Sequence, residues 1–139
     1  MKKILFTRVL LFLSIVSYAQ KQDSNPITKT FKIAVASKTQ ITKNLAIELV
    51  EVLSDSRCPK QVQCIRAGEA FIVVNIYKGE EKFLQEKLEV YPKKINEYAL
   101  EKLSDVHSKV VDIALLPYPN GIDKIDLSNY CLQLTIEQE

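Results

Sequence analysis

Short runs of alternating apolar and polar side chains are the feature that most limits how this chain can fold. The clearest run is residues 130–137 (YCLQLTIE), in which every second side chain is a large apolar one. A period of two is typical of a β-strand with one buried face. Residues 70–77 and 83–90, separated by a turn signal at Gly79, predict a β-hairpin. Further strands are predicted over residues 31–36, 45–52 and 109–116.

Six or seven short strands with few helical patterns predict an all-β fold. We expect a single antiparallel β-sandwich of immunoglobulin-like size and architecture, with a small open β-barrel as the alternative. Residues 95–106 fit either one short helix or an irregular strand. The chain has no Trp, so the likeness to immunoglobulin domains is one of architecture alone.

The first nineteen residues have the organisation of a secretory signal peptide. Two lysines precede a mainly apolar run (residues 4–16), and small side chains stand where cleavage after Ala19 requires them. An uncleaved anchor is the alternative, which the short apolar run disfavours. The sequence therefore predicts a signal peptide over residues 1–19, a short polar leader over residues 20–29 and a β-sandwich domain over residues 30–139.

Removal of the signal peptide changes the charge of the chain. The full chain has 19 basic and 17 acidic residues, a formal charge of +2. Three of the basic residues and none of the acidic ones lie in residues 1–19, so the remainder has 16 basic and 17 acidic residues, or −1. Nucleic acid requires a concentrated basic face. We therefore expect no nucleic-acid partner. From the predicted signal peptide we expect no membrane span after cleavage and a periplasmic or extracellular location.

The stretch SDSRCPKQVQCIRAGEA (residues 54–70) contains two of the three cysteines. Disulfides are the default in exported proteins. A turn started by Pro59 can bring the Cα atoms of Cys58 and Cys64 within reach of a disulfide. We therefore predict that Cys58 and Cys64 form a disulfide that closes a surface loop.

Other residues of this stretch have structural roles that can be predicted. Gly68 is expected to supply a positive φ or a close approach where the next strand starts. Arg57 has Asp55 and Glu69 as candidate partners, and Val62 is expected to turn inward.

The pattern D-S-R-C-P, then C, then A-G-E-A resembles the signature of a group of small exported bacterial proteins and lipoproteins. The group usually has Trp two residues after the second Cys, where this chain has Arg66. The resemblance implies a fold and the location of a site, and it implies no activity. It extends more loosely to residues 116–119 (LPYP) and to the strand at Tyr130. Within the stretch it rests on Asp55, Ser56, Arg57, Cys58, Pro59, Val62, Cys64, Gly68 and Ala70.

A metal site is an alternative for the two cysteines. Cys58 and Cys64 as thiolates, with His107 as the only histidine, would suit zinc or copper(I). The spacing is not that of zinc knuckles, and an oxidising compartment would join the sulfurs first. We therefore expect no metal and no cofactor. Cys131 is expected to be a half-buried free thiol, with a bridge to another cysteine as the alternative.

Catalytic motifs are absent from the sequence. The chain has no G-x-S-x-G elbow, no H-E-x-x-H and no phosphate-binding Gly-rich loop, so we expect no enzyme. Tyr118, which lies between two prolines, either exposes its ring to a protein or glycan or packs it on a strand edge.

The function predicted from the sequence is an exported, non-catalytic module at the cell envelope that binds a protein or a glycan. The alternatives are a protease inhibitor that presents Lys60 on the disulfide loop, and an accessory protein that binds copper or zinc. The candidate binding loop consists of Asp55, Arg57, Lys60, Arg66 and Tyr118.

Overall fold

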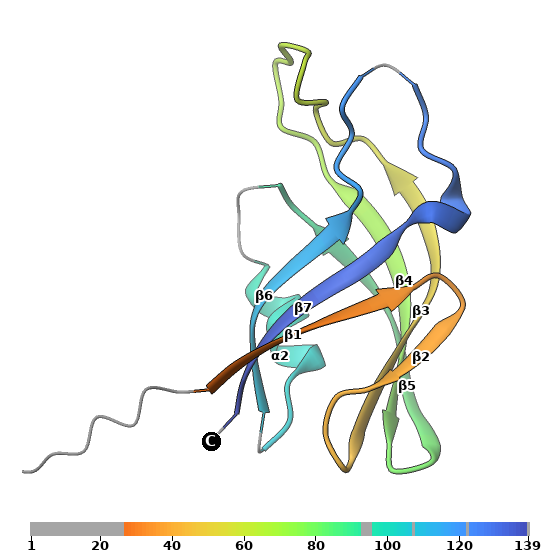
Figure 1. Cartoon of the computed structure of the whole chain (residues 1–139), viewed down its shortest axis with the longest axis vertical. Coiled ribbons are helices and arrows are strands. Elements are labelled where there is room, and N and C mark those ends of the chain that lie inside the picture. Colours follow the sequence, from red (N-terminus) through yellow and green to blue (C-terminus); the bar gives the residue numbers. More distant parts are fainter. Residues whose placement is uncertain (1–26, 93–95, 107, 122, 139) are drawn as a thin grey trace, which may run out of the picture.

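The computed structural model describes residues 27–92, 96–106, 108–121 and 123–138. Its strands form two antiparallel sheets that enclose one core (Figure 1). This confirms the predicted all-β sandwich, since the strands do not join into the single sheet of the open-barrel alternative. The smaller sheet has the order β1-β7-β6, with β1 at Ile27–Ala34, β7 at Cys131–Gln138 and β6 at Ser108–Leu116. The larger sheet has the order β2-β3-β4-β5, with β2 at Ser37–Gln40, β3 at Leu45–Asp55, β4 at Ala70–Lys78 and β5 at Glu81–Val90.

The alternating pattern of the strands produces the core. In β7, Leu132, Leu134 and Ile136 are fully buried, while the residues between them are partly exposed. Full burial of one such side chain contributes about 1.5–3 kcal/mol relative to an exposed one. The larger sheet supplies the opposite half of the core from Leu45, Ile47, Leu49, Val52, Ala70, Ile72, Val74, Ile76, Leu88 and Val90.

The segment predicted as one strand over residues 31–36 is divided between the two sheets. β1 ends at Ala34, and Ala36 has a φ of 57°. The N–H of Val35 donates to the carbonyl of Tyr130 at 3.3 Å, whereas the N–H of Ala36 donates to the carbonyl of Leu49 at 2.7 Å. The chain therefore crosses from the smaller sheet to the larger one at these two residues.

The ambiguous segment before β6 forms a short helix, α2 (Glu97–Leu103). The side chain of Asn96 accepts a hydrogen bond from the N–H of Ala99, which satisfies a free donor at the helix start. Ala99 and Leu103 are buried against the core. A 3-10 turn, η1 (Leu127–Asn129), precedes β7.

The boundaries predicted at the N-terminus are tested only in part. The predicted signal peptide and most of the predicted leader lie outside the described residues. β1 begins at Ile27, so the predicted leader extends three residues too far, to Lys29. Pairing with β7 explains the difference, because Lys29 lies opposite Ile136 in the register. Within the described ranges, no helix has the length and apolar character needed to cross a bilayer.

Two connections meet at one end of the sandwich, at the top of Figure 1. They are residues 56–69, between β3 and β4, and the described residues 117–121 and 123–130, between β6 and β7. We call this the disulfide end. The β4–β5 hairpin lies at the opposite end, because β4 starts at the disulfide end and runs away from it.

Candidate functional site

The predicted disulfide is present. Cys58 and Cys64 are joined, and their Cα atoms are 5.9 Å apart. The turn between them is closed by the N–H of Val62, which donates to the carbonyl of Pro59 at 3.1 Å. Cys131 is a free, half-buried thiol, as predicted.

The two arms of the disulfide loop pair with each other beyond the ends of β3 and β4. The N–H of Ser56 donates to the carbonyl of Glu69 at 2.9 Å, and the N–H of Cys58 donates to the carbonyl of Ala67 at 2.8 Å. Gly68 has a φ of +69°, which confirms the predicted positive φ. The main chain of Gly68 also lies close to that of Ser56, since a Cβ on Gly68 would be 1.9 Å from the carbonyl oxygen of Ser56.

Arg57 is buried and pairs with Asp55. Its Nε donates to Oδ1 of Asp55 at 2.8 Å and its Nη2 donates to Oδ2 at 2.6 Å. The side chains of Arg57 and Asp55 are only 2% and 7% exposed. Of the two partners predicted for Arg57, Asp55 is thus the observed one, while the main chain of Glu69 bonds to Ser56.

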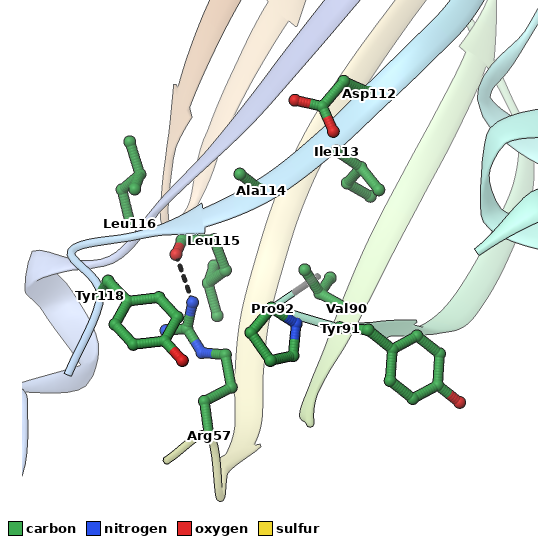
Figure 2. A pocket seen from close by; sticks show the side chains of 10 residues that line it. All are labelled: Arg57, Val90, Tyr91, Pro92, Asp112, Ile113, Ala114, Leu115, Leu116 and Tyr118. Atoms are coloured by element: carbon green, nitrogen blue, oxygen red, sulfur yellow. Dashed lines mark hydrogen bonds between the residues drawn. The ribbon is translucent and has the colours of Figure 1, made fainter. Parts of the chain in front are cut away.

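Arg57 also ties the loop to β6. Its Nη1 donates to the carbonyl of Leu115 at 2.5 Å, shown as the dashed line in Figure 2, and its Nη2 donates to the carbonyl of Pro117 at 3.3 Å. β6 is an edge strand, and an unpaired edge invites pairing with another chain. The guanidinium therefore satisfies a carbonyl at one end of this edge. Near the other end, Ser104 Oγ accepts from the N–H of Val110 at 3.0 Å.

Tyr118 packs against Arg57. Its ring centroid lies 4.9 Å from Cζ of Arg57, and its hydroxyl donates to the carbonyl of Cys58 at 2.9 Å. The side chain is half-buried. Of the two arrangements predicted for this ring, packing on the protein is therefore the one observed.

Tyr130 completes the buried cluster, a role that the alternating pattern of its strand does not predict. Its hydroxyl donates to Oδ2 of Asp55 at 2.8 Å. Burial, together with the adjacent carboxylate, raises the pKa of Tyr130 to about 12. Burial also disfavours the charged form of Asp55, but the hydrogen bonds from Arg57 and Tyr130 outweigh it and hold the pKa of that carboxyl below its usual value.

Hollows lined by described residues border this cluster, and three of them are considered in turn. The one of about 660 Å³, which we call the disulfide pocket, contains three of the predicted binding residues and is lined by Cys58, Pro59, Lys60, Cys64, Ile65, Arg66, Ala67, Pro92 and Tyr118. A second, of about 290 Å³, lies between the edge strands β5 and β6 (Figure 2) and includes Arg57 and residues 90–92 and 112–116. The third, of about 610 Å³, includes residues 53–55 and residues 123–125.

The tip of the disulfide loop exposes both charged and apolar side chains. Lys60 and Arg66 are exposed, and Ile65 is fully exposed. Val62 is 41% exposed, so the expectation that it turns inward is wrong. The disulfide itself closes this small loop, and the Pro59 turn leaves Val62 on its outer side.

Lys60 lies within a turn and not in an extended segment. Its N–H donates to the carbonyl of Pro119 at 3.0 Å, and its Nζ lies 5.8 Å from the ring centroid of Tyr118. A protease binds an extended segment through its main chain. The inhibitor alternative therefore gains no support from this geometry.

The residues proposed as metal ligands are not brought together as thiolates. The sulfurs of Cys58 and Cys64 are bonded to each other, and His107 lies outside the described residues. Among the residues that the structure describes, no group of three or more His, Cys, Asp or Glu side chains could hold a metal ion.

Comparison of the chain with models of protein families, with curated proteins and with solved structures finds no match. The resemblance of residues 54–70 to a group of exported proteins therefore stays a prediction.

Proposed function

We propose that this chain is an exported, non-catalytic β-sandwich module that binds a protein partner at the cell envelope through its disulfide end. The observation that carries the proposal is the full exposure of Ile65 at the tip of a strongly restrained loop. A large apolar side chain in this position adds nothing to the core of its own domain. Binding residues are often carried on loops that a rigid scaffold positions.

The restraints on the loop favour binding. The Cys58–Cys64 disulfide, the buried Arg57–Asp55 pair and the tight approach at Gly68 hold its main chain. A loop that is already ordered loses little conformational entropy when a partner binds. Exposed Ile65 and Val62 can then bury apolar surface against that partner.

The packing of the Tyr118 ring favours a protein partner over a glycan. The aromatic side chain at this site already lies against the cations of Arg57 and Lys60. It therefore presents less open ring surface to a sugar than an isolated tyrosine would. The exposed aliphatic side chains of the loop suit the apolar centre of a protein interface.

A non-catalytic role is supported by the polar groups of the buried cluster, because they already bond to one another and to the main chain. The carboxylate of Asp55 and the guanidinium of Arg57 are directed at each other and at neighbouring groups of the fold. Tyr130 is protonated at neutral pH, because its pKa is about 12. The arrangement suits a structural anchor for the loop better than a proton donor or a nucleophile.

Export is tested by the intact mass of the protein purified without reductant from a cell that secretes it. We expect a chain that begins at Gln20 and that accepts one alkylating group, on Cys131. A mass that retains residues 1–19, or three alkylated cysteines, would contradict the proposed compartment.

Binding is tested by a photo-crosslinking amino acid placed at Ile65, with Phe83 as the matched control. Both side chains are exposed and apolar, and Phe83 lies in β5 near the opposite end of the sandwich. We expect discrete protein adducts at the envelope from position 65 and none of the same mass from position 83. Identical adducts from both positions, or none from position 65, would contradict binding through the disulfide end.

A further inference from the structure

The disulfide pocket has a one-sided charge. Its lining residues include Lys60 and Arg66 and no acidic residue. Neither side chain forms a hydrogen bond or an ion pair with a described residue. The carboxylate of Asp55, at the end of β3, is paired with Arg57, and that of Glu89 accepts a hydrogen bond from the hydroxyl of Tyr91. The two cations are therefore available to an external anion.

The rest of the pocket lining is mostly apolar. Pro59, Ile65, Ala67 and Pro92 line it together with the disulfide and Tyr118. Its volume of about 660 Å³ lies within the range of pockets that bind ligands in proteins. A ligand that fills it needs an anionic group for the two cations and an apolar group for Ile65 and the prolines.

An acidic peptide fits these requirements better than other anions. A carboxylate matches the planar fork of an arginine, which can donate two parallel hydrogen bonds to it. Nucleic acid needs many phosphate contacts, whereas this pocket offers two cations. At an anionic membrane surface two cations contribute only about 1 kcal/mol of binding free energy each. A single exposed isoleucine adds little further binding by insertion into the lipid.

We propose that the disulfide pocket binds an acidic peptide segment of the partner, in which an Asp or Glu lies close to an aliphatic or aromatic residue. Lys60 and Arg66 hold the carboxylate, and Ile65 and Pro92 contact the apolar side chain. This inference rests on the proposed function, because it names the chemistry of the partner at the same end of the molecule.

The test is selection of random displayed peptides on the folded protein. The wild type is compared with the double variant Lys60→Gln/Arg66→Gln and with Lys43→Gln/Lys109→Gln, in which two exposed lysines away from the pocket are neutralised. We expect the wild type and the control to enrich peptides with Asp or Glu near an apolar residue. For the best such peptide, the pocket variant should bind about ten- to a hundredfold more weakly, the range for loss of hydrogen bonds to charged groups.

Thermal unfolding of all three proteins verifies that they are folded. A neutral or basic consensus, no consensus, or the same acidic consensus with the pocket variant would overturn the proposal. So would co-sedimentation of the wild type with phosphatidylglycerol vesicles that the pocket variant loses, because a lipid surface would then be the anion. If position 65 crosslinks to a protein but no acidic consensus appears, this inference fails and the proposed function stands. If both experiments are negative, both fail.

Discussion

The hydroxyl of Tyr130 donates a hydrogen bond to Oδ2 of Asp55, the same oxygen that accepts from Nη2 of Arg57. One carboxylate thus links the end of β3 to the residue that precedes β7. Through Arg57 it is linked further to the carbonyl of Leu115 in β6. The loop that carries the proposed binding surface is therefore anchored to strands of both sheets by one buried cluster.

Replacement of Asp55 by Asn should strongly destabilise the fold. The guanidinium of Arg57 would remain buried without a counter-charge, and breaking a buried pair in this way costs about 3–5 kcal/mol. Urea denaturation measures the free energy of unfolding. Asp123→Asn is the control, because Asp123 is exposed in a loop, and its effect should stay within about 0.5 kcal/mol. Equal losses of unfolding free energy in the two variants would mean that the Asp55–Arg57 pair does not stabilise the fold.

The contribution of Asp55 should depend on pH. Its pKa in the folded protein lies below the ordinary value of 3.8, because the hydrogen bonds from Arg57 and Tyr130 outweigh the effect of burial. A lowered pKa stabilises the fold above the unfolded-state pKa, and this stability is lost as the pH falls through the folded-state value. The difference in unfolding free energy between wild type and Asp55→Asn should therefore be constant near neutral pH. It should shrink below about pH 4, and a difference that persists unchanged to pH 2 would contradict the assignment.

Tyr130→Phe should show the opposite dependence on pH. The variant loses a hydrogen bond to a charged acceptor, which costs about 1.5–3 kcal/mol at neutral pH. The pKa of Tyr130 is raised from 10.0 to about 12 in the folded protein. A raised pKa gives stability that is present below the unfolded-state value and is lost as the pH rises through the folded-state value. The advantage of the wild type should accordingly decline between pH 10 and 12, as followed by denaturation at each pH. A constant advantage over this range would be inconsistent with the Tyr130–Asp55 bond.

Local features of the site could be predicted from the sequence. The disulfide follows from the short spacing of Cys58 and Cys64, and the positive φ of Gly68 follows from its place just before a strand. The Asp55–Arg57 pair is also local, because the two residues are separated by one position. Each of these features depends on few residues, so the sequence pattern contains the needed information.

Long-range features could not be predicted in the same way. The Asp55–Tyr130 bond spans 75 residues, and the bond from Arg57 to Leu115 spans 58. Both depend on how the two sheets pack, which the alternation of side chains does not specify. The crossing near Ala36 could not be predicted, because a positive φ at alanine has no signal in the sequence.

Gly68→Ala should destabilise the protein more than Gly79→Ala. Both glycines have a positive φ, of 69° and 65°, so each substitution introduces backbone strain of about 1–2 kcal/mol. A Cβ at Gly79 meets nothing within 4 Å, whereas at Gly68 it lies 1.9 Å from a backbone oxygen of Ser56. The additional loss of unfolding free energy in Gly68→Ala measures the cost of moving the loop away from the end of β3. Chemical denaturation of the two variants gives this difference directly, and equal losses would show that the loop yields without cost.

Removal of the disulfide should separate stability from binding. In Cys58→Ser/Cys64→Ser the short loop is no longer closed, and the chain-entropy model gives a loss of about 2 kcal/mol for a loop of this size. The core residues of both sheets are untouched, so the protein should still fold, with a lower midpoint in urea. Cys131→Ser is the control for loss of a thiol outside the loop, since Cys131 is free and half-buried in β7. The position-65 crosslink should weaken in the disulfide variant and persist in the control, because the ordered main chain around Ile65 lowers the entropy cost of binding. A crosslink of unchanged yield in the folded disulfide variant would mean that the partner orders the loop itself.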